Sequence, residues 1–326
     1  MFCRSIEVVR LLISVFVILN ILAFWGSEAL TQNIDPSQLS ASDTAVGRQQ
    51  EAPTNRLTVS KKFWWDEEWY ENGIIAQPNN FEIVERHVAY INKSDDTEIP
   101  AILYRPKQSG KFPGVLFQHG RRGLDDLVQR LAKRIAARGF IVLAPDVYTA
   151  RFIDPFPVEH LTETENDVDA GIDYLLNLPD VSTRKICFYS HTRGGYYTLI
   201  VATKLKRQNK TVACYVSSYP HWQNPNSAEP MQIYRYASEI EQLEIPSLIF
   251  IGEYEQYHRR STIEMAVTTL KKSGRDIRLI IYPGVGRGFD FRPESVRTFA
   301  DDLATKDAIK RAANFINLHL KPRNTN

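Results

Sequence analysis

Between residues 80 and 320, short apolar runs alternate with stretches in which apolar residues recur at helical spacing. "FPGVLFQHG" (112–120) ends in a turn, and "LDDLVQRLAKRIAARG" (124–139) follows it with a helical pattern and a glycine stop. Strands are expected at 112–120, 140–147, 185–191, 212–220, 246–253 and 277–284, helices at 124–139, 162–179, 194–209, 261–274 and 306–320, and edge strands at 83–92 and 100–106. Apolar strands separated by amphipathic helices predict a mostly parallel, doubly wound α/β sheet with helices on both faces.

The chain is long enough for one large core or at most two domains, with 326 residues of which 43% are hydrophobic. Its 40 Lys and Arg and 38 Asp and Glu give a formal net charge of +2. This balance offers no bulk field for nucleic acid or for an acidic partner, so neither is expected.

Residues 1–29 are expected to be a targeting segment rather than part of the core. Arg4 and Arg10 precede an uncharged apolar run at 11–25, and the small residues of "GSEAL" after it fit a cleavage site. As a helix the run would span roughly 22 Å, short of the ~30 Å hydrocarbon core. A cleaved signal peptide and an uncleaved membrane anchor both remain open, and both predict export of everything from residue 30 onward.

Two further segments precede the strands. Residues 30–60 are rich in Gln, Ser, Thr, Asp and Pro without a sustained period, which indicates a flexible linker before a domain at 61–326. "FWWDEEWYENG" (63–73) alternates aromatic with acidic residues and is interpreted as a strap packed against the domain. A carbohydrate or membrane-surface patch, or a surface for a protein partner, are the alternatives for this segment.

Cys187 and Cys214 lie in two of the apolar strand-like runs. Export would permit a disulfide between them. Both are nevertheless interpreted as buried free thiols, because pairing between parallel central strands is geometrically awkward.

Chemistry in a sheet of this kind gathers beyond the carboxyl ends of the strands. Four such ends carry a recognisable order in the sequence. "YSHTRGGYY" (189–197) has the strand, tight turn and helix of a nucleophile elbow. The loop after "LFQHG" is placed to supply an oxyanion-hole amide, and "GEYE" (252–255) and "YPGVGRGF" (282–289) stand where an acid and a base would complete a triad.

From "ARGFIVLAPDVY" (137–148), the elbow, "IGEYE" (251–255) and "YPGVGRGF", residues 80–322 resemble the dienelactone hydrolase family of α/β-hydrolases. The resemblance implies the α/β-hydrolase fold and hydrolysis of small carboxylic esters or lactones without a cofactor. It assigns the nucleophile position to Thr192, the acid position to Glu255 and the base position to Arg287. It also assigns one oxyanion amide to Arg193 and the other to the turn formed by Gly120, Arg121 and Arg122.

All three triad positions depart from the family's usual residues, which are Ser or Cys, Asp, and His. A guanidinium stays protonated at any workable pH, so Arg287 cannot act as a general base, and it is expected to pair with Glu255. Losing a general base costs roughly 10²–10⁴-fold in rate. Thr192 is β-branched and Ser190 replaces the usual glycine, so the turn is predicted to relax out of the strained elbow conformation.

His258, three residues after Glu255, is the candidate for a substitute base. The alternative is a surface histidine beside Arg259 and Arg260. No metal-ligand spacing, phosphate loop or dinucleotide motif appears, so no metal or cofactor is expected.

Four arginines, namely Arg121, Arg122, Arg193 and Arg287, are expected at the same edge of the sheet. Converging guanidinium groups favour a carboxylate or phosphate ligand. Alternatively, these side chains point to solvent or pair with Asp125, Asp126 and Glu255. Two functions therefore remain open: a hydrolase of esters or lactones with weak or absent activity, and a non-catalytic descendant that binds a small anion or a protein partner.

Overall fold

The chain forms a central eight-stranded sheet with the strand order β1-β2-β4-β3-β5-β6-β7-β8 in a computed structural model that describes residues 81–321. The strands are β1 (Ile83–Asn92), β2 (Thr97–Pro106), β3 (Gly114–Gln118), β4 (Ile141–Pro145), β5 (Ile186–His191), β6 (Val212–Ser218), β7 (Ser247–Tyr254) and β8 (Ile277–Gly286). β1 and β2 pair antiparallel, as do β2 and β4, and every other neighbouring pair is parallel. The predicted mostly parallel, doubly wound sheet is confirmed.

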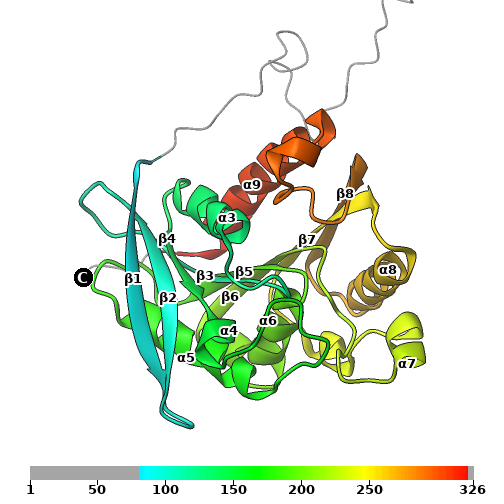
Figure 1. Cartoon of the computed structure of the whole chain (residues 1–326), viewed down its shortest axis with the longest axis horizontal. Coiled ribbons are helices and arrows are strands. Elements are labelled where there is room, and N and C mark those ends of the chain that lie inside the picture. The colour runs from blue at the N-terminus through cyan, green and yellow to red at the C-terminus, as the bar shows by residue number, and fades with distance from the viewer. Residues whose placement is uncertain (1–80, 322–326) are drawn as a thin grey trace, which may run out of the picture. The chain divides into compact units, whose positions relative to one another are not determined.

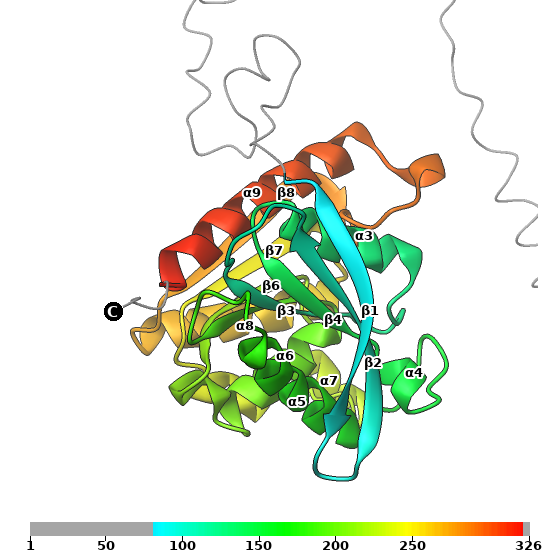
Figure 2. The same ribbon diagram turned by 90° about the vertical axis from the view of Figure 1, so that its left-hand side faces the viewer.

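Helices cover both faces of this sheet (Figures 1 and 2). They are α3 (Asp126–Ala136), α4 (Val147–Ala150), α5 (Glu163–Asn177), α6 (Gly194–Thr203), α7 (Glu229–Tyr234), α8 (Tyr257–Lys272) and α9 (Phe299–His319). α3 and α9 lie on one face, while α5, α6 and α8 lie on the other. The strands β3, β4 and β5 are buried at every position, which explains their continuous apolar runs.

The structure corrects three details of the predicted elements. β2 lies inside the sheet between β1 and β4, so only β1 of that pair is an edge strand. α9 begins at Phe299 rather than 306, because Thr298 and Asp301 form a reciprocal capping box. The predicted helix from 194 ends at Thr203, six residues early.

The prediction that Cys187 and Cys214 stay unpaired is wrong, since they form a disulfide. β5 and β6 are neighbours, and a register shift between Ile186 and Cys187 sets the two cysteines directly opposite each other. Their Cα atoms are 4.7 Å apart, within the range that a disulfide bridges without backbone movement. Sequence alone did not reveal this register.

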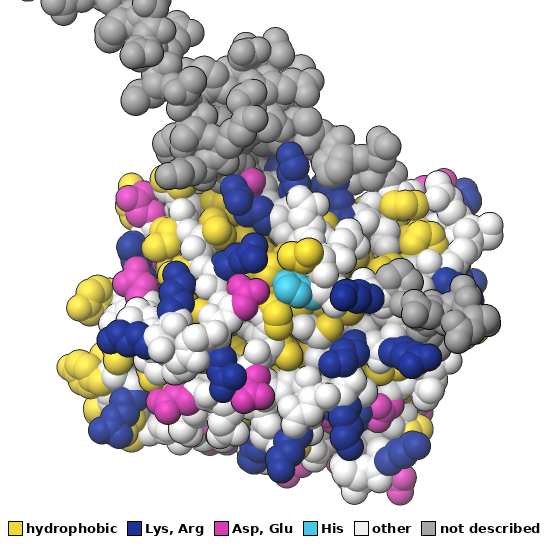
Figure 3. All heavy atoms as spheres, turned by 180° about the vertical axis from the view of Figure 1, so that it is seen from behind, with side chains coloured by type: hydrophobic (Ala, Val, Ile, Leu, Met, Phe, Trp, Pro, Cys, Tyr) yellow, Lys and Arg dark blue, Asp and Glu magenta, His cyan; other side chains and the backbone are white. Residues whose placement is uncertain are grey.

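The predicted targeting segment (1–29), linker (30–60) and strap (63–73) lie outside the described residues. Within residues 81–321, no helix is both long and apolar enough to cross a membrane. On the face seen in Figure 3, Lys and Arg side chains are interspersed with Asp and Glu over a mixed surface, in keeping with the chain's small net charge.

Candidate functional site

Thr192 forms the turn between β5 and α6 and has a φ angle of 50°. The prediction of a relaxed turn is therefore wrong, because the left-handed conformation of an elbow is kept with a β-branched residue. Three backbone hydrogen bonds hold it there: the Thr192 N–H donates to Ser218 O (3.2 Å), and its carbonyl accepts from His221 N (2.7 Å) and Gly195 N (3.0 Å).

The two glycines after the turn explain why it cannot relax. A Cβ atom on Gly194 would lie 2.4 Å from the Gln118 carbonyl oxygen, and one on Gly195 would lie 2.6 Å from the Pro220 side chain. Both positions therefore require glycine, and α6 begins in contact with the ends of β3 and of the loop after β6. This packing fixes the path of the chain through Thr192 whatever that residue's own preference.

The Thr192 hydroxyl faces the turn after β3. A Cβ atom on Gly120 would come within 1.5 Å of Thr192 Oγ1, so the hydroxyl rests on the bare Cα of that glycine. Within residues 81–321 this buried hydroxyl has no hydrogen-bond partner. No side chain of the described chain is therefore in position to take its proton.

Glu255 and Arg287, the predicted acid and base positions, are joined by an ion pair of 3.1 Å between Glu255 Oε1 and Arg287 NH1. Glu255 Oε1 also accepts from the Gln256 backbone N–H at 3.0 Å, whereas Oε2 is buried without a partner in the described chain. The Arg287 guanidinium lies over the ring of Tyr219 at 5.3 Å. This pair cannot shuttle a proton, because its guanidinium does not give one up.

Arg121 and Arg193, on either side of Gly120 and Thr192, both bind the loop between α4 and α5. Arg193 donates to the carbonyl oxygens of Pro157 (3.1 Å), Val158 (2.9 Å) and Glu159 (2.8 Å). Arg121 donates to Phe156 O (2.7 Å) and Pro157 O (2.9 Å). These bonds fix the position of the loop. Carbonyl groups carry no net charge, so the positive charges of Arg121 and Arg193 remain uncompensated.

Arg259 and His221 join the same site, although the sequence analysis did not single them out. Burial, followed by repulsion from Arg287, lowers the pKa of Arg259 to about 9, with smaller contributions from Arg193 and Arg121. We call these four residues, Arg121, Arg193, Arg259 and Arg287, the arginine cluster. His221 follows β6, and Arg259 lies in the first turn of α8, shortly after β7. A place beyond the carboxyl end of a strand was the one sequence signal that could have pointed to them.

His221 is only 3% exposed, and its Nε2 atom has no hydrogen-bond partner in the described chain. Burial, and then the four guanidinium groups of the arginine cluster, lower the pKa of His221 well below its ordinary value. The imidazole is therefore neutral at physiological pH, next to several positive charges and one carboxylate, Glu255.

Two of the predicted residues lie outside this cluster. Arg122 pairs with Asp125 at 2.5 Å and lies 5.6 Å from the ring centre of Phe291. His258 lies in the first turn of α8, where its carbonyl accepts a hydrogen bond from Thr262 Oγ1 (2.8 Å). His258 makes no hydrogen bond to the Thr192 hydroxyl.

Beneath the turn lies a buried polar network that sequence reasoning also missed. His191 Nε2 is 2.9 Å from Asp290 Oδ2, and the Tyr219 hydroxyl donates to the other oxygen of Asp290. Burial, with Asp290 second, raises the pKa of Tyr219. The network ties the strand before Thr192 to the loop after Arg287, so it fixes the two ends of the site against each other.

Comparison with known proteins identifies the family. A sequence profile described as the dienelactone hydrolase family matches residues 99–320, which is more than half of the chain. The chain belongs to the dienelactone hydrolase family. The match runs from β2 to α9 and includes every residue of the site described above.

Individual relatives within or near this family are distant. A putative carboxymethylenebutenolidase of Synechocystis sp. is 22% identical over 211 residues, covering 60% of this chain and 83% of the relative. A probable 2-oxo-3-(5-oxofuran-2-ylidene)propanoate lactonase of Bradyrhizobium sp. is 22% identical over 238 residues, covering 69% and 91%. The crystal structure of a putative dienelactone hydrolase from Klebsiella pneumoniae has a TM-score of 0.58 at 17% identity, covering 72% of this chain and 99% of that one.

Family membership supports a dienelactone hydrolase-like esterase or lactonase framework, and the structural likeness confirms the α/β-hydrolase fold. Within residues 81–321, no three His, Cys, Asp or Glu side chains gather as a metal site would require.

Proposed function

We propose that the domain binds a small carboxylate over the Thr192 turn and that hydrolysis by the inherited triad is weak or absent. The observation that carries the proposal is the charge at the turn. Four guanidinium groups act on His221 and on one another, and Glu255 is the carboxylate placed among them. Such a surplus of partly buried positive charge is costly unless an anion compensates it.

Unpartnered polar atoms at the same place support binding of a polar ligand. His221 Nε2, Thr192 Oγ1 and Glu255 Oε2 are buried without hydrogen bonds in the described part of the chain. Buried polar groups in native proteins nearly always have a partner, so several orphans around one turn mark a place where a ligand or ordered water completes the bonding. A carboxylate would accept from the donors and neutralise the guanidinium groups.

The test is a thermal shift of the purified full chain with a panel of acetate, benzoate, succinate and maleate. Saturation at 100-fold above Kd stabilises by about 2.7 kcal/mol, which corresponds to roughly 5–10 °C for a domain of this size. Arg259→Gln should remove the shift. Arg260→Gln is the matched control, because Arg260 is next in sequence yet pairs with Glu264 at 2.8 Å.

No shift with any member of the panel, or an equal loss in both variants, would contradict the proposal. Binding should also weaken as NaCl rises, because the attraction is electrostatic and is screened.

Ester or lactone hydrolysis is the second candidate, and the retained φ of 50° at Thr192 favours it. Strain of this kind clusters at active sites. The missing element is a base, so the double variant Thr192→Ser/Arg287→His should hydrolyse p-nitrophenyl acetate at least 100-fold faster than the wild type. If instead the wild type already turns over the ester and Thr192→Ala abolishes this, the chain is an enzyme and the binding proposal is wrong.

We also propose that the domain is exported, through the segment at 1–29. The Cys187–Cys214 disulfide supports this, because such bonds persist mainly in oxidising compartments. Cell fractionation followed by thiol labelling under denaturing conditions tests it. Recovery of the chain in the cytosol with both thiols free would contradict export.

A further inference from the structure

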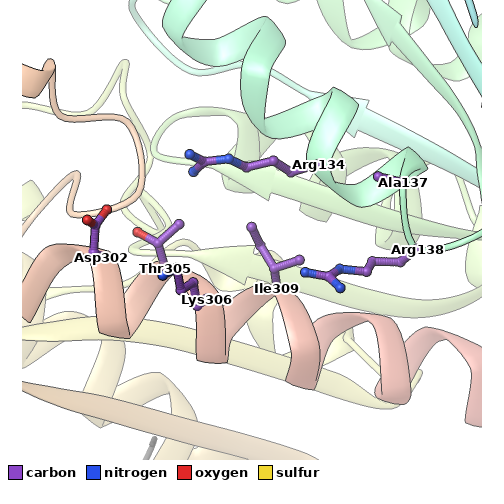
Figure 4. A pocket seen from close by; sticks show the side chains of 7 residues that line it. All are labelled: Arg134, Ala137, Arg138, Asp302, Thr305, Lys306 and Ile309. Carbon is purple, nitrogen blue, oxygen red and sulfur yellow. The ribbon is translucent and has the colours of Figure 1, made fainter. Parts of the chain in front are cut away.

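A second site lies between α3 and α9, on the face of the sheet opposite to α6. A cavity of about 180 Å³ opens there, lined by Arg134 of α3 and by Arg138, two residues beyond the end of that helix at Ala136. Asp302 and Lys306 line it from α9 (Figure 4). Three cationic side chains and one carboxylate therefore surround the same small volume.

The carboxylate is already neutralised. Asp302 pairs with Arg297 at 3.2 Å, whereas Arg134 makes no ion pair within residues 81–321. Burial, followed by repulsion from Arg130, lowers the pKa of Arg134, and burial lowers the pKa of Arg138. Arg134 and Lys306 thus bring positive charge to the cavity beside a carboxylate that is already paired, and Arg134 does so in a partly desolvated position.

The floor of the cavity adds no counter-charge. Thr305 and Ile309, both only 4% exposed, form it. The Thr305 hydroxyl already donates to the carbonyl oxygen of Asp301 at 2.6 Å. An anion in the cavity would therefore meet guanidinium and ammonium donors at its sides and an apolar surface below.

We propose that this cavity binds the phosphate group of a phosphomonoester. A phosphate dianion carries enough charge to compensate cations from two helices, and its oxygens match the planar fork of an arginine. The volume is below the ~300–1,000 Å³ of pockets that enclose a whole ligand. Only the phosphate enters, and the organic part stays outside, whether it belongs to a soluble metabolite or to a lipid headgroup.

The cavity is separate from the arginine cluster. α3 begins at Asp126, after the turn at Gly120, and Arg134 lies 8 residues further along this helix. At about 1.5 Å per residue this is roughly 12 Å along the helix axis, and no residue that lines the cavity belongs to the arginine cluster. The failure of one proposal therefore leaves the other standing.

Calorimetric titration of the full chain with phenyl phosphate tests the site. Arg134→Gln should weaken binding at least tenfold, because it removes the cation that lacks an ion pair. Lys133→Gln is the matched control, since it removes the same charge from the neighbouring exposed position and should change Kd less than twofold. Circular dichroism and melting of both variants verify that they fold.

A second arm uses phosphatidylcholine vesicles with and without phosphatidate. Cosedimentation only with phosphatidate, lost in Arg134→Gln, identifies a lipid headgroup as the source, and titration without cosedimentation identifies a soluble ester. The proposal is overturned if phenyl phosphate does not bind at millimolar concentration, or if Arg134→Gln binds it as tightly as wild type. Loss of binding in Arg259→Gln but not in Arg134→Gln also overturns it, because the phosphate would then occupy the arginine cluster.

Discussion

Replacing Thr192 by glycine and by alanine measures the strain at the turn. Alanine removes the β-branch and the unpartnered hydroxyl but keeps a Cβ atom, and glycine removes the Cβ as well. At a φ of 50° the Cβ costs roughly 1–2 kcal/mol. Glycine loses about 0.5–1 kcal/mol more chain entropy on folding than alanine. We therefore expect Thr192→Gly to be more stable than Thr192→Ala by about 0.5–1 kcal/mol.

The control pair is Thr268→Gly and Thr268→Ala on the exposed side of α8, where Thr268 Oγ1 donates to Glu264 O at 2.7 Å. In an ordinary helix interior glycine is less stable than alanine by about 1 kcal/mol. The difference between glycine and alanine should thus change sign from one position to the other. Urea unfolding monitored by circular dichroism, with equal m-values, gives the four free energies. If glycine is the less stable of the two at both positions, Thr192 is not held in the left-handed region, and the strain argument fails.

Three further outcomes follow from the buried groups around the turn. Cys187→Ala/Cys214→Ala should lower the free energy of unfolding by about 3–4 kcal/mol, because the disulfide closes a loop with a sequence separation of 27 residues in the unfolded chain. In urea unfolding, the reduced wild type should have the same stability as this variant. Asp290→Ala should lower the free energy of unfolding by about 2–3 kcal/mol, because the buried donors that bind this carboxylate are left without an acceptor. Tyr219→Phe should lower it less, and equal losses in the two variants would contradict the network. Since the folded pKa of His221 is lowered, only the unfolded chain takes up this proton as pH falls below about 6.5, so stability falls with it by up to ~1.4 kcal/mol per pH unit. His221→Leu should flatten that slope in unfolding measured from pH 7 to pH 5, and an unchanged slope would show that His221 is not the group responsible.

The sheet could be predicted from the sequence because burial of a strand on both faces leaves a direct trace, a continuous apolar run. The run at 185–191 and the strand Ile186–His191 illustrate this. Strand neighbours and register leave no such trace. β2 was therefore placed at an edge, and the pairing of Cys187 with Cys214 was missed, because both depend on which strand lies beside which.

The site shows the same division between local and tertiary causes. The family resemblance assigned Glu255 and Arg287 to the acid and base positions and so predicted that they could pair, and this pair is present. The positions of Arg259 and His221 depend on how the start of α8 and the loop after β6 lie over the strand ends. No spacing along the chain encodes that proximity, so the arginine cluster emerges only when the loops are placed.

The conformation of Thr192 is the sharpest case of tertiary packing overriding local preference. Its φ is set by neighbours, namely the carbonyl of Gln118 against Gly194 and the side chain of Pro220 against Gly195. The same packing leaves the Arg193 N–H at the start of α6 without a backbone acceptor in the described chain, and such an amide favours negative charge. An elbow built for an oxyanion and a site that binds a carboxylate need the same amide in the same place. The site can therefore lack a general base, keep the strained backbone of Thr192 and still bind an anion. Variants at Thr192 and Arg259 are needed to distinguish hydrolysis from binding.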